Sequence, residues 1–206
     1  MSTRHCEQSE AIPWREIASS SYRPPRNDEL HLEVCVRSEI YAVLHQLDAA
    51  LAGVFWVITG SVGLALQGVP LEPNDVDIQT DDDGAYEAAR RLAAHVTQPV
   101  TRVERSWGRS LMGKLDIDGL QVEIIGDIQT RRDDGWEPPP DLASLARTVE
   151  ADGMRLRVLP LAYEAAAYRR MGRLEKAALI QRYADKEQTQ SGHSAGAGGL
   201  STPPAG

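Results

Sequence analysis

WVITGSVGLALQGVPLEPNDVDIQT, residues 56–80, holds an apolar strand that ends at Gly60-Ser61, then a short helical segment, a loop and a second apolar run with Asp75 and Asp77. Side chains alternate faces along a strand, so Asp75 and Asp77 point the same way. Two neighbouring carboxylates repel each other and cost stability. A cation between them removes that cost, and Mg²⁺ is a hard ion that prefers oxygen ligands. The pattern predicts a magnesium site.

The Gly-Ser turn indicates a second ligand close to the metal. A Gly-Ser turn that opens a helix offers backbone N–H groups and a hydroxyl to a phosphate, here from Gly60 and Ser61. Metal and phosphate sites so close in sequence indicate nucleotide chemistry. Each motif alone has a plainer interpretation: Asp-x-Asp as a solvated strand end, and Gly-Ser as ordinary turn chemistry.

A third carboxylate is expected on a later strand. Residues 111–126 read LMGKLDIDGLQVEIIG, and Asp118-Gly119 between two alternating apolar runs predicts a two-residue hairpin. Glu123 lies in the middle of the second arm, among apolar neighbours. Burying a carboxylate there is costly unless it is paired or binds a cation. The alternative for Glu123 is an edge strand with its side chain in water. Asp116, on the first arm, competes for the role, and Asp127 lies just past the second arm.

The order of strand, Gly-Ser, helix and Asp-x-Asp resembles the signature of the nucleotidyltransferase superfamily, which has the DNA polymerase beta-like fold. The resemblance covers roughly residues 30–185 and is closest to small bacterial stand-alone enzymes, including aminoglycoside and toxin–antitoxin nucleotidyltransferases. It implies that Asp75, Asp77 and Glu123 are catalytic and bind the metal. It also implies that Gly60 and Ser61 bind the nucleotide.

The reaction that the resemblance implies is a Mg²⁺-dependent transfer of a nucleoside monophosphate from an NTP, such as ATP, to an acceptor hydroxyl, with release of pyrophosphate. Glu123 would then bind a second Mg²⁺ or accept the proton of the hydroxyl. A small-molecule acceptor is favoured, and a tRNA end or a protein side chain stays open. The alternative is a nucleotidyltransferase-like toxin–antitoxin component or a non-catalytic nucleotide-binding partner protein.

The composition narrows the class of protein. The chain has 206 residues, 42% hydrophobic and 25% charged, which is typical of a globular protein with one domain of ordinary size. The net charge of −8 argues against a large contact with a polynucleotide. No apolar run is long enough to span a membrane, and Cys6 and Cys35 provide no disulfide framework. A cytoplasmic location is expected, while the oligomeric state leaves no signal in the sequence.

The periodicity predicts an α+β fold: a small mixed β-sheet with helices packed on one side and a short helical C-terminal segment. A second hairpin is expected around Asp152-Gly153, and Pro160 should start a helix. The expected helices cover 30–51, 61–67 capped by Ser61, 84–96 capped by Asp82 or Asp83, 161–171 and 174–183. The expected strands cover 54–59, 76–79, 100–105, 111–117, 120–126, 147–151 and 154–159, with a polar loop at 133–140.

The two ends differ from the middle. Residues 1–29 are expected to be a non-core extension that resembles a translated intergenic repeat, and residues 186–206, rich in Gly, Ser, Ala and Pro, a disordered tail. Residues 30–185 then form the nucleotidyltransferase domain. Within its last helices, Arg170, Arg173 and Lys176 would share one face, provided that Gly172 does not break the register.

Overall fold

An eight-stranded mixed sheet forms the centre of the protein in the computed structural model, which describes residues 36–194. The predicted extension at 1–29 and residues 195–206 lie outside the described residues. The strands are β1 Val57–Thr59, β2 Val76–Thr80, β3 Val96–Arg105, β4 Gly108–Ile117, β5 Leu120–Arg132, β6 Gly135–Trp136, β7 Arg147–Ala151 and β8 Met154–Val158. Their order is β3-β4-β5-β2-β1-β8-β7, and β6 pairs with the end of β5. Pairs β2–β5 and β1–β8 are parallel, and the others are antiparallel.

Within residues 36–194, six α-helices accompany the sheet, which confirms the predicted α+β fold class. They are α1 Ser38–Ala50, α2 Gly60–Ala65, α3 Asp82–Arg91, α4 Leu142–Leu145, α5 Leu161–Arg170 and α6 Leu174–Ser194. A 3-10 turn at Ala93–His95 leads into β3. No helix within residues 36–194 is long and apolar enough to cross a membrane.

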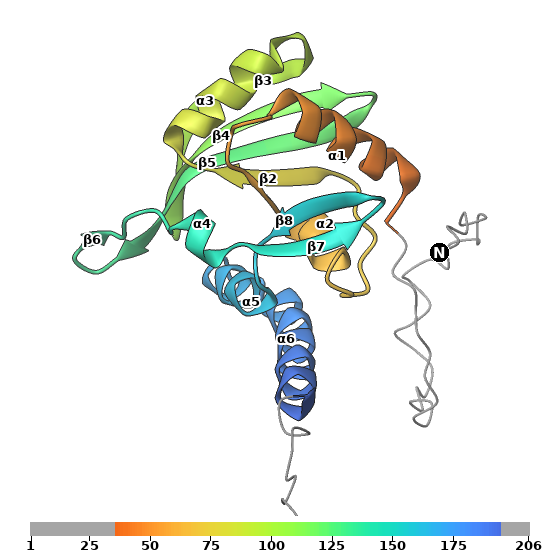
Figure 1. Cartoon of the computed structure of the whole chain (residues 1–206). Coiled ribbons are helices and arrows are strands. Elements are labelled where there is room, and N and C mark those ends of the chain that lie inside the picture. The colour runs from red at the N-terminus through yellow and green to blue at the C-terminus, as the bar shows by residue number, and fades with distance from the viewer. Residues whose placement is uncertain (1–35, 195–206) are drawn as a thin grey trace, which may run out of the picture.

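The main core lies between one face of the sheet and helices α1 and α3, which run together above the strands (Figure 1). Strand alternation places Ile58, Ile78 and Ile124 on this face, and all three are fully buried. They pack against the apolar side of α1, which includes Ile40 and Leu44. Burying such side chains contributes roughly 1.5–3 kcal/mol each.

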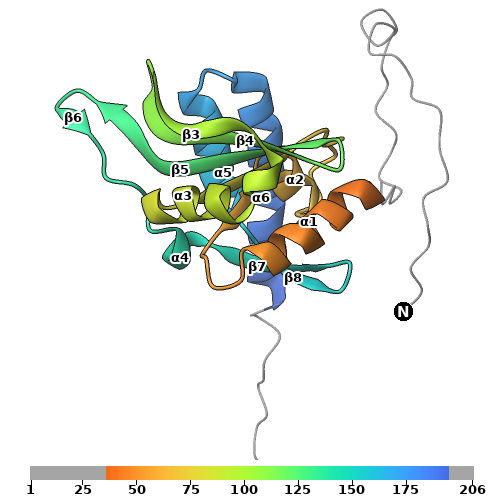
Figure 2. The same ribbon diagram turned by 90° about the horizontal axis from the view of Figure 1, so that it is seen from above.

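The opposite face of the sheet carries polar residues at the alternate positions and lies toward α5 and α6 (Figure 1). A second apolar cluster, separate from the main core, joins α2, α5 and α6 through residues that include Leu64, Leu161, Ala165 and Ile180. This cluster holds the C-terminal helices beside the polar face without covering all of it. Figure 2 shows that the β5–β6 end projects beyond the helices.

Several helix ends differ from the sequence prediction. Helix α2 begins at Gly60 with Thr59 at its N-cap, so the predicted cap Ser61 was wrong: it lies inside the helix. Helix α3 is capped by Asp81, which accepts a hydrogen bond of 2.7 Å from Gly84 N, and not by Asp82 or Asp83. Helix α6 continues to Ser194, so the part of the expected tail at 186–194 is helical.

Candidate active site

Three neighbouring strands bring Thr59, Asp77 and Glu123 into one row. In the parallel β2–β5 pair Asp77 lies opposite Glu123, and in the antiparallel β1–β2 pair Asp77 lies opposite Thr59. Because the even-numbered neighbours of Asp77 and Glu123 fill the core, these three side chains face the other side of the sheet. Asp75 lies one residue before β2 and adds its negative charge to the same place. The structure thus places the three sequence-predicted carboxylates close together.

Gly60 lies directly against Asp77. A Cβ atom on Gly60 would stand 2.0 Å from Asp77 Oδ2, and Gly60 has a φ of +65°. Both facts require glycine, since other residues rarely adopt this angle and no side chain fits the space. The first residue of α2 therefore brings bare backbone next to the carboxylate.

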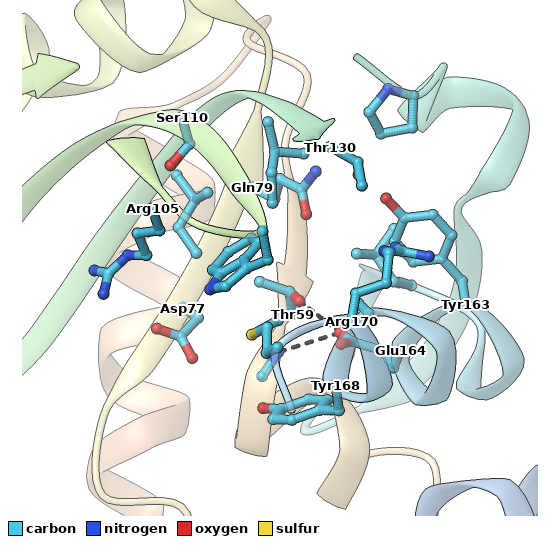
Figure 3. A pocket seen from close by; sticks show the side chains of 18 of the residues that line it. Thr59, Asp77, Gln79, Arg105, Ser110, Thr130, Tyr163, Glu164, Tyr168 and Arg170 are labelled. Atoms are coloured by element: carbon cyan, nitrogen blue, oxygen red, sulfur yellow. Dashed lines mark hydrogen bonds between the residues drawn. The ribbon is translucent and has the colours of Figure 1, made fainter. Parts of the chain in front are cut away.

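Glu164, on the first turn of α5, holds the turn between β1 and α2 in place. Its side chain is 3% exposed and accepts hydrogen bonds from Thr59 Oγ1, at 2.5 Å, and from Gly60 N, at 3.2 Å (Figure 3). Burial raises the pKa of Glu164 to about 7, and the two hydrogen bonds act in the opposite direction. The sequence analysis missed Glu164. Its spacing from Leu161, Ala165 and Tyr168 on the buried side of α5 is a signal that could have identified it.

Asp77 lies in a strongly negative environment. Burial is the main cause that raises its pKa to about 7, and the charges of Asp75, Glu123 and Glu164 contribute to this rise in that order. The positive charge of Lys176 lowers the pKa of Asp77. Clustered carboxylates of this kind are a recognised feature of functional sites.

Glu123 is held by a cation that the sequence analysis did not consider. Lys114 lies opposite Glu123 in the β4–β5 pair, and its Nζ is 2.7 Å from Glu123 Oε1. Strand β5 lies between β4 and β2, so the alternative of a water-facing edge strand does not apply to Glu123. The competitor Asp116 is exposed and accepts a hydrogen bond from Gly119 N within the hairpin turn. Asp127 forms an ion pair of 2.7 Å with Arg102.

The donor set fits a hard divalent cation in its chemistry. Asp75 and Asp77 provide carboxylate oxygens, and a cation would relieve the repulsion that raises the pKa of Asp77. Within residues 36–194, no three His, Cys, Asp or Glu side chains are already gathered as a metal site. The ion pair with Lys114 accounts for the position of Glu123, which would have to exchange this partner in order to join the other two carboxylates.

A cavity of about 690 Å³ opens over this row of side chains. Its floor is formed by β1, β2, β4 and β5, one wall by α5, and its far end by the β5–β6 hairpin and the segment before α4 (Figure 3). Gly60, Asp77, Glu123 and Glu164 line it. Ser61 and Asp75 are not among the lining residues; Ser61 is half-buried inside α2.

The basic residues of the last helices do not share one face. Gly172, with a φ of +76°, separates α5, which ends at Arg170, from Arg173 and α6, although Arg170 and Arg173 both line the cavity. Arg173 and Lys176 both approach the ring of Tyr168, at 5.8 and 4.5 Å from its centre. Burial lowers the pKa of Lys176, as does Arg173, whereas Asp77, Glu164 and Asp75 raise it. Lys176 thus lies close enough to these carboxylates for their charges to affect its pKa.

Comparison with known proteins relates this chain to a known family. The profile of the aminoglycoside-2''-adenylyltransferase family matches residues 39–183. A Thermotoga maritima protein assigned as a nucleotidyltransferase, TM1012, is 44% identical, with a TM-score of 0.65, over 74% of this chain and 96% of its own. The structure of ANT(2'')-Ia with adenylyl-2''-tobramycin is 11% identical, with a TM-score of 0.48, over 77% of this chain and 97% of its own. No curated protein sequence matches the chain significantly.

Proposed function

Because the chain belongs to the aminoglycoside-2''-adenylyltransferase family and is a nucleotidyltransferase, we propose that it transfers a nucleoside monophosphate from an NTP to a hydroxyl group of a small molecule. Pyrophosphate is the second product. The reaction depends on Mg²⁺, and ATP is the proposed nucleotide. An enzyme that consumes NTPs would work in the cytoplasm.

The observation that carries the proposal is the contact between Gly60 and Asp77 beside Glu123. Bare backbone lies against one carboxylate, and a second carboxylate lies at the same register position on the next strand. Phosphate oxygens need close backbone approach, and a phosphate-bound cation needs carboxylate ligands. Both requirements meet at this one place in the cavity.

Different residues of the site would contact the phosphates of the nucleotide and the hydroxyl of the acceptor. Gly60 contributes space, since its own N–H already donates to Glu164. Ser61, the next residue of α2, does not line the cavity, so its proposed contact with the phosphates would be through its backbone N–H at the start of this helix. Asp75 and Asp77, joined by Glu123, would hold Mg²⁺, which when bound supplies positive charge to the transferred phosphoryl group.

Glu123 and Lys114 are in a position to handle the proton of the acceptor. A carboxylate within hydrogen-bond reach of a hydroxyl can accept its proton in the transition state. Lys114 Nζ lies 2.7 Å from Glu123 Oε1 and holds this carboxylate in place. Lys176 lies on the α5–α6 side, 4.5 Å from the centre of the Tyr168 ring, where it can neutralise the phosphates that leave.

Pyrophosphate release from each of the four NTPs, with Mg²⁺ and a panel of acceptors, tests this function. The panel contains aminoglycosides, neutral polyols and tRNA, and the matched control is Glu123→Gln. Release that requires Mg²⁺ and a small-molecule acceptor, and that is lost in the control, is the expected result. Release only with tRNA would favour the toxin-like alternative, and nucleotide binding without release from any acceptor would favour a non-catalytic partner protein.

A further inference from the structure

One buried side chain at the far end of the cavity has no role in the mechanism above. Gln79 lies two residues after Asp77 on β2 and points to the same face of the sheet. It lines the cavity, although only 4% of its surface is exposed. No hydrogen bond of its Nε2 atom within the described residues has standard geometry, although the amide lies close enough to the Tyr163 hydroxyl to lower the pKa of that phenol. A buried amide N–H without a well-formed hydrogen bond is costly, so a ligand atom is the natural partner.

The residues around Gln79 indicate the chemistry of that ligand. Ile125 lies opposite Gln79 on β5, and Met112 lies opposite Ile125 on β4, which gives an apolar floor. Tyr163 and Thr130 complete the group, and Figure 3 shows the Tyr163 hydroxyl pointing toward Thr130 and Gln79. Together these five residues form a subsite with apolar surfaces and neutral polar groups.

The subsite lacks the charges that a polycationic ligand would need. Two carboxylates act on Tyr163: Glu164, which accepts hydrogen bonds from Thr59 and Gly60, and Glu137, which is paired with Arg132. Arg170 stands at the other side of Tyr163 and lowers the pKa of this phenol, which burial raises. At this end of the cavity, a ligand with several ammonium groups would therefore lie next to the Arg170 guanidinium, and both of these carboxylates already have partners.

We propose that the Gln79 subsite binds the nucleobase of the NTP and that the Gln79 amide reads its edge. This inference rests on the proposed function. The amide carries a donor and an acceptor side by side, the arrangement that pairs with the edge of adenine. Two strand residues span about 6.6 Å, so the base lies one ribose away from the phosphates at Asp77. The apolar side chains of Met112 and Ile125 cover the flat face of the ring.

Calorimetric titration separates base recognition from phosphate recognition. The probes, each with Mg²⁺, are α,β-methylene ATP and inorganic tripolyphosphate. Gln79→Leu should weaken binding of the ATP analogue about tenfold and leave tripolyphosphate binding within about twofold, because only the base contacts the amide. The control is Gln98→Leu, an exposed glutamine on β3 outside the cavity, which should change neither affinity.

The unchanged protein offers a second measurement that does not depend on the folding of a variant. Methylene analogues of the four NTPs should differ in affinity by about fivefold or more, with ATP the tightest, and Gln79→Glu should reduce that spread. Equal affinities for all four analogues would overturn the inference. So would a Gln79→Leu protein that binds ATP normally and loses only acceptor-dependent turnover, because the subsite would then belong to the acceptor. If the unchanged protein binds neither the ATP analogue nor tripolyphosphate, the proposed function itself fails.

Discussion

A methyl group on Gly60 would stand 2.0 Å from Asp77 Oδ2. The contact joins the first residue of α2 to the second acidic residue of the Asp-x-Asp motif, across the β1–β2 pair. Glu164 fixes the same turn through Gly60 N and Thr59 Oγ1. The bare backbone next to Asp77 is thus held in place by contacts among Gly60, Asp77 and Glu164, which are far apart in sequence.

Gly60→Ala should reduce nucleotide affinity much more than Ser61→Ala, because the new Cβ collides with Asp77 in addition to straining the backbone. The matched control is Gly68→Ala: Gly68 has a φ of +84° and nothing within 4 Å of its would-be Cβ. Both glycine variants should lose about 1–2 kcal/mol of stability from the left-handed angle. Calorimetry should show weaker nucleotide binding for Gly60→Ala alone, whereas equal losses of affinity would mean that the contact is merely structural.

Glu164→Gln should make stability less dependent on pH in the absence of metal. The pKa of Glu164 is raised to about 7 in the folded state, above the ordinary value of 4.5. The folded state therefore binds the proton more tightly, and the stability present below pH 4.5 is lost as pH rises to 7, by up to about 3 kcal/mol. Glutamine keeps the hydrogen-bond acceptor and removes the charge, so the variant should be the more stable protein at pH 8. Urea unfolding at pH 5 and pH 8 measures this difference, and identical pH profiles would rule out the buried charge.

Lys114→Met should tighten Mg²⁺ binding in the absence of nucleotide by about threefold to tenfold. Lys114 neutralises Glu123, so its removal leaves the metal as the cation nearest to the three carboxylates. Lys186→Met, on the exposed part of α6, provides the control. Titration of Mg²⁺ into each protein measures the effect, and an unchanged or weaker affinity would show that Glu123 does not compete for the ion.

Glu123→Gln should bind nucleotide nearly as well as the parent and lose turnover by a factor of ~10²–10⁴, as expected for a lost general base. Asp116→Asn is the control, since Asp116 is exposed and serves the hairpin turn. Steady-state pyrophosphate release distinguishes the two variants. Normal turnover in Glu123→Gln together with a loss in Asp116→Asn would transfer the role to Asp116.

Much of the fold could be predicted from local patterns. The hairpin at Asp118-Gly119 and the one at Asp152-Gly153 carry strong turn signals, and both are present in the structure. The ends of helices α2 and α3 were less predictable. Asp81, Asp82 and Asp83 are equally good caps in sequence, and the direction of the chain leaving β2 selects Asp81.

The pairing within the candidate site depends on tertiary structure. Alternation along one strand places Glu123 on a polar face, but only the β2–β5 register shows that its neighbour is Asp77. Lys114 and Glu164 come from elements that a local reading treats as an ordinary hairpin and an ordinary helix. Their relation to the site becomes visible only when the sheet and α5 are assembled.

Calorimetric titration of ATP with Mg²⁺ into the parent and into Asp77→Asn measures whether this carboxylate is needed to bind the nucleotide with its metal. We expect measurable Mg²⁺-dependent binding by the parent and none by Asp77→Asn. The variant should remain folded and at least as stable as the parent, because it loses one of several repelling charges. Asp82→Asn, on the exposed start of α3, should behave as the parent does. Binding of ATP and Mg²⁺ to Asp77→Asn with the affinity of the parent would show that Asp77 does not hold the metal.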